Sequence, residues 1–348
     1  MACPIELMMT GPQVAFPEFR PRLPWWSGDL QTCRNSLGGR SVSLAQFETR
    51  RLRVPASAGS GDCQQAVLNA PLTDANQPLL LLVHGLAGSE DSDYLRASAC
   101  YFLEHGYSVL RVNLRGAGPS STTCRVRYCA GSSTDLSDLI ADLPAELVGG
   151  GVVVMGFSLG ANILLKFLGE PGGARRRVLA AVSVCAPIDL AATCRNILRW
   201  RNAGYHRWFL SHMKAETLAS GVPLDAGVRS AITRARTIYE FDECFTAPSH
   251  GYANADDYYR QCSAQEFLEG INVPTLVITA QNDPIVPFAP YRAQDWRRAT
   301  ALTCLFPRSG GHVGFHGQGS STPWHDRCAR RWFQHAARLN LRARARRK

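Results

Sequence analysis

Residues 151–165 read GVVVMGFSLGANILL, and no other part of the sequence says more about the fold. The apolar run at 151–157 predicts a buried strand, and residues 159–168 continue with the pattern of a helix. The small residues of the intervening GFSLG permit a sharp turn in which backbone segments nearly touch. A serine on such a turn is exposed beside the amino end of a helix, where a negatively charged transition state is stabilised. The stretch therefore predicts a strand, a turn and a helix, with Ser158 as a nucleophile.

Strands and helices alternate on both sides of this turn. Residues 47–54 and 64–68 predict a hairpin, and further strands are expected at 79–83, 107–112, 178–184, 274–280 and 301–306. Helices are expected at 93–105, 135–147, 291–299 and 324–339. Alternation at this spacing predicts an α/β protein with a mostly parallel, doubly wound sheet.

The alternation breaks for some ninety residues after Asp189, where the sequence is helical and rich in aromatic residues without a convincing strand. We expect a helical cap inserted into the sheet domain. The predicted organisation is an N-terminal arm at 1–44, the first part of the core at 45–190, the cap at 191–270, the second part of the core at 271–340, and a basic tail at 341–348.

A serine nucleophile requires a base and an orienting carboxylate, and in this kind of fold the acid precedes the histidine in the chain. Asp283 directly follows the strand expected at 274–280, at the carboxyl edge of the sheet. His312 lies in the glycine-rich loop after the next strand. The predicted triad is therefore Ser158, Asp283 and His312.

Four other residues compete for these roles. Asp189 follows the strand at 178–184 and could supply the acid, but Asp283 has the better context. His316 and His325 lie close to His312 in sequence, yet neither stands in a glycine-flanked loop directly after a strand. Cys185 lacks a glycine-framed turn and is expected to be packed.

The loop HGLAGS at 84–89 follows the buried strand at 79–83. Such a loop can direct one backbone N–H toward the site, while the residue after the nucleophile supplies another. We expect the amides of Leu86 and Leu159 to form an oxyanion hole. His84 is expected to fix the loop rather than to act as a second base.

Several separated motifs together resemble the YheT-type branch of the α/β-hydrolase superfamily. They are HGLAGS at 84–89, DYLR at 93–96, NLRG at 113–116, GFSLGAN at 156–162, SHGY at 249–252 with DYY at 257–259, and GGHVGF at 310–315. The resemblance extends from GDLQT at 28–32 to the last helix, and it departs from the family at Asp29, where a histidine is usual. It implies an α/β-hydrolase fold and a carboxylesterase for short to medium acyl esters that needs no metal or organic cofactor.

The resulting functional prediction is a serine hydrolase that cleaves a carboxylic ester through an acyl-enzyme. An acyltransferase or thioesterase would use the same triad, and a non-catalytic binding protein would normally have lost a triad residue. The cap segment at 197–210 carries many apolar and aromatic residues. Part of this surface is expected to line an acyl pocket, with Trp208 as the first choice, although packing of the cap onto the core would also account for it.

Composition narrows the partners of the 348-residue chain. Its apolar runs are far shorter than the roughly 18 residues of a membrane-spanning helix, and its first residues lack the pattern of a secretory signal, so a cytoplasmic protein is expected. The 12 cysteines are scattered singly, as in a protein with reduced thiols. Six charges of the net +10 lie in the last eleven residues, which leaves too small an excess to infer a nucleic-acid partner. We expect a small, lipid-like ester as substrate and at most weak contact of the tail with an anionic surface.

Overall fold

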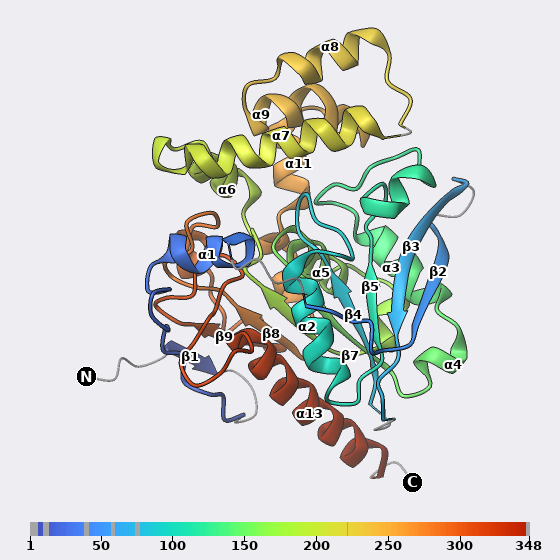
Figure 1. Cartoon of the computed structure of the whole chain (residues 1–348), viewed down its shortest axis with the longest axis vertical. Coiled ribbons are helices and arrows are strands. Elements are labelled where there is room, and N and C mark those ends of the chain that lie inside the picture. Colours follow the sequence, from blue (N-terminus) through green and yellow to red (C-terminus); the bar gives the residue numbers. More distant parts are fainter. Residues whose placement is uncertain are drawn as a thin grey trace.

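The computed structural model describes residues 6–9, 14–37, 42–56, 60–73, 77–220 and 222–345. Within these residues the chain forms one sheet of nine strands in the order β1-β9-β8-β7-β6-β4-β5-β3-β2 (Figure 1). The strands are β1 (Glu6–Met9), β2 (Thr49–Ala56), β3 (Asp62–Asn69), β4 (Leu79–Val83), β5 (Val109–Val112), β6 (Val152–Phe157), β7 (Val178–Val184), β8 (Thr275–Ile278) and β9 (Leu302–Phe306).

The six strands from β4 to β9 are parallel, and β1, β2 and β3 pair antiparallel at the two edges. Every residue of β4 and β6 is buried, because both faces of the sheet are covered. The α/β class and the mostly parallel sheet predicted from the alternating pattern are confirmed.

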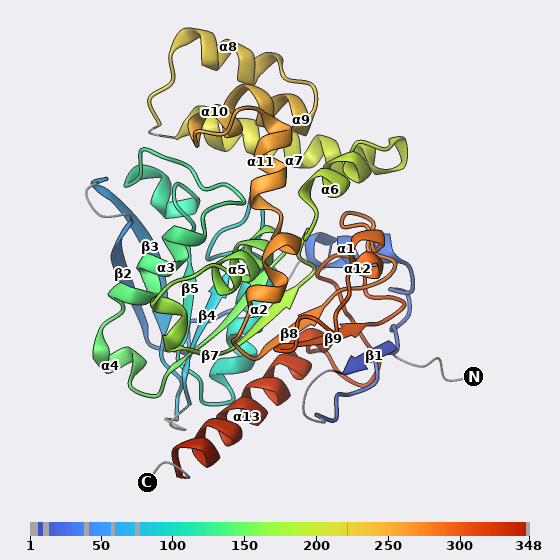
Figure 2. The same ribbon diagram turned by 180° about the vertical axis from the view of Figure 1, so that it is seen from behind.

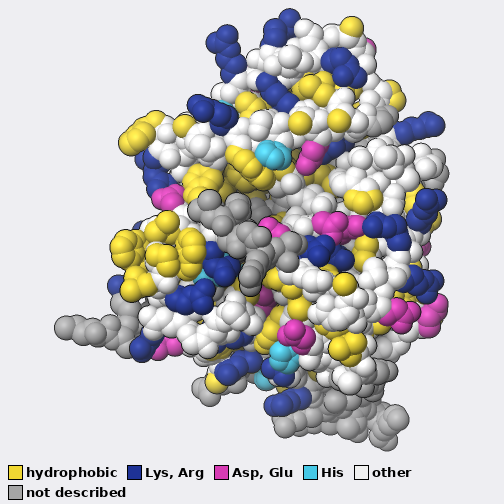
Figure 3. All heavy atoms as spheres, viewed as in Figure 1, with side chains coloured by type: hydrophobic (Ala, Val, Ile, Leu, Met, Phe, Trp, Pro, Cys, Tyr) yellow, Lys and Arg dark blue, Asp and Glu magenta, His cyan; other side chains and the backbone are white. Residues whose placement is uncertain are grey.

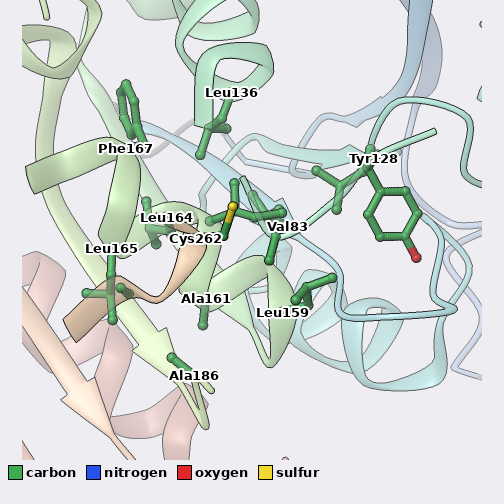
Figure 4. Close-up of a cluster of buried hydrophobic side chains, with 14 of the residues drawn as sticks. Val83, Tyr128, Leu136, Leu159, Ala161, Leu164, Leu165, Phe167, Ala186 and Cys262 are labelled. Atoms are coloured by element: carbon green, nitrogen blue, oxygen red, sulfur yellow. The ribbon is translucent and has the colours of Figure 1, made fainter. Parts of the chain in front are cut away.

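Helices cover both faces of the sheet. On one face, α2 (Asp93–Leu103) and α13 (Trp324–Ala345) pack with Leu80 and Leu82 of β4. On the other face, α3 (Ser133–Asp142) and α5 (Leu159–Gly169) pack with Leu81 and Val83 of the same strand (Figure 4). The alternating side chains of β4 therefore contribute to two apolar layers, one on each face of the sheet. Helix α5 packs beside β6, the strand that ends directly before Ser158.

Between β7 and β8 the described residues form helices and no strand. They are α6 (Leu190–Ile197), α7 (Ala203–Ala219), α8 (Ala226–Arg234), α9 (Ile238–Phe241), α10 (Ala247–Ser249) and α11 (Ala255–Cys262), with a π-helical turn at Asp242–Thr246. These helices lie beyond the carboxyl ends of the parallel strands, at the top of Figure 1 and of the reverse view in Figure 2.

Two expected helices differ from the structure. The helix expected at 135–147 is two helices, α3 and α4 (Ala145–Val148), because Pro144 interrupts the hydrogen-bond ladder between them. The helix expected at 291–299 is only the short α12 (Ala289–Ala293). The indole N–H of Trp296 donates to the Tyr291 carbonyl oxygen at 2.8 Å. A side chain thus occupies the carbonyl that would accept the next backbone hydrogen bond of a longer helix.

The two ends of the chain contain elements that the sequence did not predict. The expected surface arm contributes the edge strand β1, which pairs with β9, and the helix α1 (Gly28–Leu37). At the other end, α13 continues to Ala345, into the segment expected as a basic tail, and residues 346–348 lie outside the described part. No helix in the described ranges is both long and apolar enough to cross a bilayer. Every described cysteine is a free thiol.

Candidate active site

Ser158 lies on the turn between β6 and α5 in a strained backbone conformation, with φ 50° and ψ −121°. Its N–H donates to the Val184 carbonyl oxygen at 2.8 Å. A Cβ at Gly160 would collide with the carbonyl oxygen of His84, and one at Gly156 would lie 2.6 Å from that of Gly160. The turn therefore has no room for a side chain at Gly156 or Gly160, as the GFSLG motif predicted.

The structure brings His312 and Asp283 to this serine in one hydrogen-bonded chain. The His312 Nε2 lies 2.9 Å from the Ser158 Oγ, and its Nδ1 lies 2.8 Å from Asp283 Oδ2. Asp283 is buried, and its Oδ1 accepts from the N–H groups of Ile285 and Val286 at 2.8 and 3.0 Å. These amides fix the carboxylate, which orients the imidazole with Nδ1–H toward it and leaves Nε2 to accept the serine proton.

The loop after β4 lies against the nucleophile. A Cβ at Gly85 would lie 2.9 Å from the Ser158 Cβ, so the backbone of this loop touches the turn directly. The amide of Gly85 donates to the Tyr94 hydroxyl and that of Ala87 to the Tyr128 hydroxyl, each at 2.9 Å. Within the described residues, the intervening amide of Leu86 and that of Leu159 donate to no protein acceptor. Two N–H groups are thus available beside the serine.

His84 is fully buried beneath this loop. Its Nδ1 donates to the Gly85 carbonyl oxygen at 2.7 Å, and its Nε2 accepts from the Leu114 N–H at 3.1 Å. Burial lowers the pKa of His84 to about 4, so the ring is neutral at pH 7. Both nitrogens are used to hold the backbone, which is the structural role that the sequence suggested.

Comparisons with known proteins show the family of this chain. Residues 78–317 match the family described as alpha/beta hydrolase fold. The chain belongs to the α/β-hydrolase family. It is 31% identical over 307 residues to the putative esterase YheT of Escherichia coli, a match that covers 86% of this chain and 87% of that protein. It is 30% identical over 277 residues to a monoacylglycerol lipase of Saccharomyces cerevisiae, with 75% of this chain and 58% of the lipase covered. This chain thus spans less than two thirds of the yeast protein.

A solved structure supports the fold alone. An esterase from Pyrococcus furiosus superposes on this chain with a TM-score of 0.58 at 16% identity, and 93% of this chain and 99% of the esterase are covered.

The competing residues lie in other settings. The Asp189 carboxylate caps the amino end of α6. Burial lowers the pKa of both His316 and His325 to about 3, and His325 lies 3.5 Å from the carboxylate of its neighbour Asp326. Cys185 is buried and its Sγ accepts from the Val313 N–H at 3.4 Å. None of these contacts is with Ser158.

Cys185, Asp283 and His312 are also the one group in the described residues whose ligand atoms lie close enough to hold a metal ion. Burial raises the pKa of the Cys185 thiol well above its usual range, and a neutral thiol is a poor ligand. The Asp283 and His312 atoms are already hydrogen-bonded to each other. The donor set therefore fits a hydrogen-bonded triad better than a metal centre.

A cavity of about 530 Å³ opens above the serine. Its floor includes Gly85, Leu86, Ser158 and His312, and its walls are formed by Thr32 and Cys33 of α1 and by Arg201, Tyr205, Trp208 and Phe209 of the cap. Apolar side chains gather where the cap faces the sheet domain (Figure 3). Trp208 lines this cavity with 48% of its surface exposed, whereas Trp200, also in the predicted apolar segment, is 90% exposed and lies outside it.

A smaller, mostly apolar cavity of about 80 Å³ also reaches Ser158. It lies under the cap and includes Leu86, Leu159, Pro187, Leu190, Ile197, Phe209, Met213, Ile238, Tyr258, Ile285 and Val286. Its one carboxyl group is Asp242, whose pKa burial raises to about 6.

One hydrogen bond of the site was not predicted from the sequence. The Thr32 Oγ1 of α1 accepts from the backbone N–H of His312 at 2.8 Å. The only signal was GDLQT at 28–32, which contributed to the family resemblance without a role of its own.

Proposed function

We propose that this hydrolase cleaves carboxylic esters through an acyl-enzyme on Ser158, with His312 as the base and Asp283 as the orienting acid. The observation that carries the proposal is the continuous chain from Ser158 Oγ through His312 to Asp283, with contacts of 2.9 and 2.8 Å, on a strained turn that opens into a cavity. A structural serine would require neither the strain nor the aligned imidazole.

In the first half of the reaction, the Ser158 Oγ attacks the ester carbonyl carbon while its proton passes to His312 Nε2. The oxygen of the tetrahedral intermediate accepts hydrogen bonds from the amides of Leu86 and Leu159. As the carbon–oxygen bond of the leaving alcohol breaks, His312 returns the proton to the alkoxide. Asp283 stabilises the imidazolium throughout.

In the second half, water replaces the alcohol. His312 takes a proton from water, the hydroxide attacks the acyl carbon, and the proton then returns to Ser158 Oγ as the acid leaves. Water and an alcohol can compete as acceptors of the acyl group at this step. An alcohol bound in the 530 Å³ cavity would yield acyl transfer instead of hydrolysis.

The two cavities support a lipid-like ester with a short to medium acyl chain. The apolar 80 Å³ cavity beside Ser158 fits the acyl chain, and the larger cavity is open enough for the alcohol portion. The names of the relatives, a putative esterase and a monoacylglycerol lipase, point to the same class of substrate.

The test is rapid-mixing kinetics with p-nitrophenyl esters of increasing acyl length. We expect a burst of p-nitrophenol close to one equivalent per enzyme whenever deacylation is slower than acylation, and a faster steady state on adding hydroxylamine. Product analysis with added alcohol distinguishes an acyltransferase, which would form the new ester in preference to the acid. Thioesters run in parallel distinguish a thioesterase. Absence of turnover with every ester and thioester would contradict the proposal.

A further inference from the structure

The loop that carries His312 is strained along most of its length. Gly310, Gly311, Val313 and Phe315 all have positive φ, at 150°, 59°, 58° and 50°. Positive φ is uncommon for residues other than glycine and is a genuine outlier for the β-branched Val313. Such a backbone persists only where surrounding contacts hold it. The alignment of His312 therefore depends on what packs against this loop.

Helix α1 supplies those contacts from the opposite end of the chain. The Thr32 Oγ1 accepts from the His312 N–H at 2.8 Å and donates to the Gly28 carbonyl oxygen at 2.7 Å. The hydroxyl thus has a donor on one side and an acceptor on the other. It connects the helix to the backbone of the residue that carries the imidazole.

Gln31 of the same helix holds the far end of the loop. It is fully buried, its Oε1 accepts from the His316 N–H at 2.7 Å, and its Nε2 donates to the His316 carbonyl oxygen at 3.1 Å. A second contact of Nε2, with the Trp25 carbonyl oxygen at 2.5 Å, joins the side chain to the arm that precedes α1. Both ends of the segment from His312 to His316 are bonded to α1.

The acid turn is part of the same assembly. A Cβ at Gly28 would collide with the Asn282 carbonyl oxygen, and a Cβ at Gly311 would collide with the Gly28 carbonyl oxygen. The Asn282 Oδ1 also accepts from the Gly311 N–H at 3.1 Å. Helix α1 therefore lies in backbone contact with the loop of His312 and with the residue next to Asp283.

The cap side of α1 is held more weakly. Asp29 accepts from the Tyr205 hydroxyl at 3.0 Å and from the Arg201 guanidinium at 3.1 Å. The side chains of Asp29 and Arg201 are about half exposed, so this ion pair contributes little free energy. Asp29 thus provides a matched comparison on the same helix, with contacts to the cap and none to the His312 loop.

We propose that Thr32 is a positioning residue for His312: its hydroxyl, supported by Gln31, holds the strained loop so that the imidazole stays between Ser158 and Asp283. This inference rests on the proposed function. Without the Thr32 acceptor, the part-buried His312 N–H would lose its partner and the loop could relax toward ordinary φ values. A displacement of about 1 Å at a reacting group costs up to roughly 10²-fold in rate.

The experiment compares Thr32→Val, which removes the acceptor at nearly constant shape, with Thr32→Ser, which keeps it. We expect Thr32→Val to lower kcat for a p-nitrophenyl ester by about 10- to 100-fold with little change in KM, and Thr32→Ser to restore kcat to within about 3-fold. Asp29→Asn should leave kcat within about 3-fold, because it changes only the cap contact. If Thr32→Val does not fold, as judged by thermal unfolding, Thr32→Ala replaces it.

A second measurement does not depend on turnover. The proton between His312 Nδ1 and Asp283 gives a far-downfield NMR resonance, which we expect in the wild type and in Thr32→Ser and expect to be lost or broadened in Thr32→Val. If the wild type hydrolyses no ester, the proposed function fails while this resonance still tests the role of Thr32. Wild-type kcat and an unchanged resonance in Thr32→Val would overturn the inference. Equal losses of kcat in the Val and Ser variants would also overturn it.

Discussion

The turn of Ser158 and the loop of His312 are both strained, but they are held by different parts of the molecule. The turn is held by the sheet itself, through the Val184 carbonyl and the backbone of β4 that presses on Gly160. The loop is held by α1, a helix 280 residues away in sequence at the Thr32 contact. The nucleophile is thus positioned by the same packing that stabilises the core, whereas the base depends on an added element. The fold could therefore survive changes that misalign the base.

The largest expected effect is that of Ser158→Ala, which removes the nucleophile and leaves the turn intact. We expect kcat for ester hydrolysis to fall by several powers of ten, up to about 10⁶-fold, with an unchanged thermal unfolding curve. Ser211→Ala on the cap is the control, because Ser211 is exposed and its hydroxyl contacts only Trp208 and His212 of its own helix, α7. Retention of more than about a hundredth of the activity in Ser158→Ala would exclude the serine as nucleophile.

Asp283→Asn tests the other half of the comparison. The amide cannot stabilise the imidazolium or fix its tautomer, so kcat should fall by roughly 10⁴-fold. Asp189→Asn should act mildly, because asparagine caps a helix about as well as aspartate does. Steady-state kinetics of both variants measure the two effects. A larger loss of kcat in Asp189→Asn than in Asp283→Asn would identify Asp189, after β7, as the acid.

The difference between turn and loop also explains what the sequence could predict. β4, β6 and the GFSLG turn were predicted from local pattern, because continuous apolar runs and small residues leave few alternatives. The hydrogen bond between Thr32 and His312 could not be predicted from local pattern, because its two residues are 280 positions apart and meet only in the folded chain. The length of the helix at α12 was overestimated for a similar reason, because the Trp296 indole occupies a carbonyl oxygen that a longer helix would use.

Matched glycine substitutions compare the two regions directly. A Cβ at Gly160 meets the carbonyls of β4 and of His84, which cannot move, so Gly160→Ala should lower the free energy of unfolding by about 3 kcal/mol or more. A Cβ at Gly314 meets the carbonyl oxygens of Gln31 in α1 and of Gly310 in the same loop, at 2.5 and 2.7 Å. Because neither belongs to the sheet, Gly314→Ala should lower the free energy of unfolding by less, about 1 to 2 kcal/mol, while still lowering kcat. Gly172→Ala is the control, with nothing within 4 Å. Urea unfolding that shows equal losses at positions 160 and 314 would contradict the comparison.

The pH dependence of stability tests the role of His84, which lies beneath the loop after β4. Burial lowers the pKa of His84 from its usual 6.5 to about 4, so below about pH 6.5 the unfolded chain binds a proton that the folded chain does not. The contribution of His84 to stability is therefore fully present above that pH and is lost as the pH falls toward 4. His84→Gln removes this term, so the stability difference between wild type and variant should shrink by up to about 1.4 kcal/mol per pH unit. A difference that stays constant in urea unfolding across this range would show that the pKa of His84 is the same in the folded and the unfolded chain.

The smallest expected effect concerns the cap. If acyl chains too long for the 80 Å³ cavity extend into the larger cavity beside Trp208, specificity constants of the wild type should rise a few-fold per carbon from acetate, in line with about 0.8 kcal/mol per buried methylene, before levelling off. Trp208→Ala should flatten this slope more than it lowers acetate turnover. Trp200→Ala should not, because Trp200 is 90% exposed and outside the cavity. A wild-type rate that falls steadily from acetate upward would indicate that the cap only packs.

The most direct measurement of the central claim is covalent labelling with a fluorophosphonate, followed by peptide mapping. We expect one label per chain, on Ser158, with no labelling of Ser158→Ala and much slower labelling of Asp283→Asn. Labelling of a different residue, or a wild type that stays unlabelled while folded, would contradict the assignment of Ser158, His312 and Asp283 as a working triad.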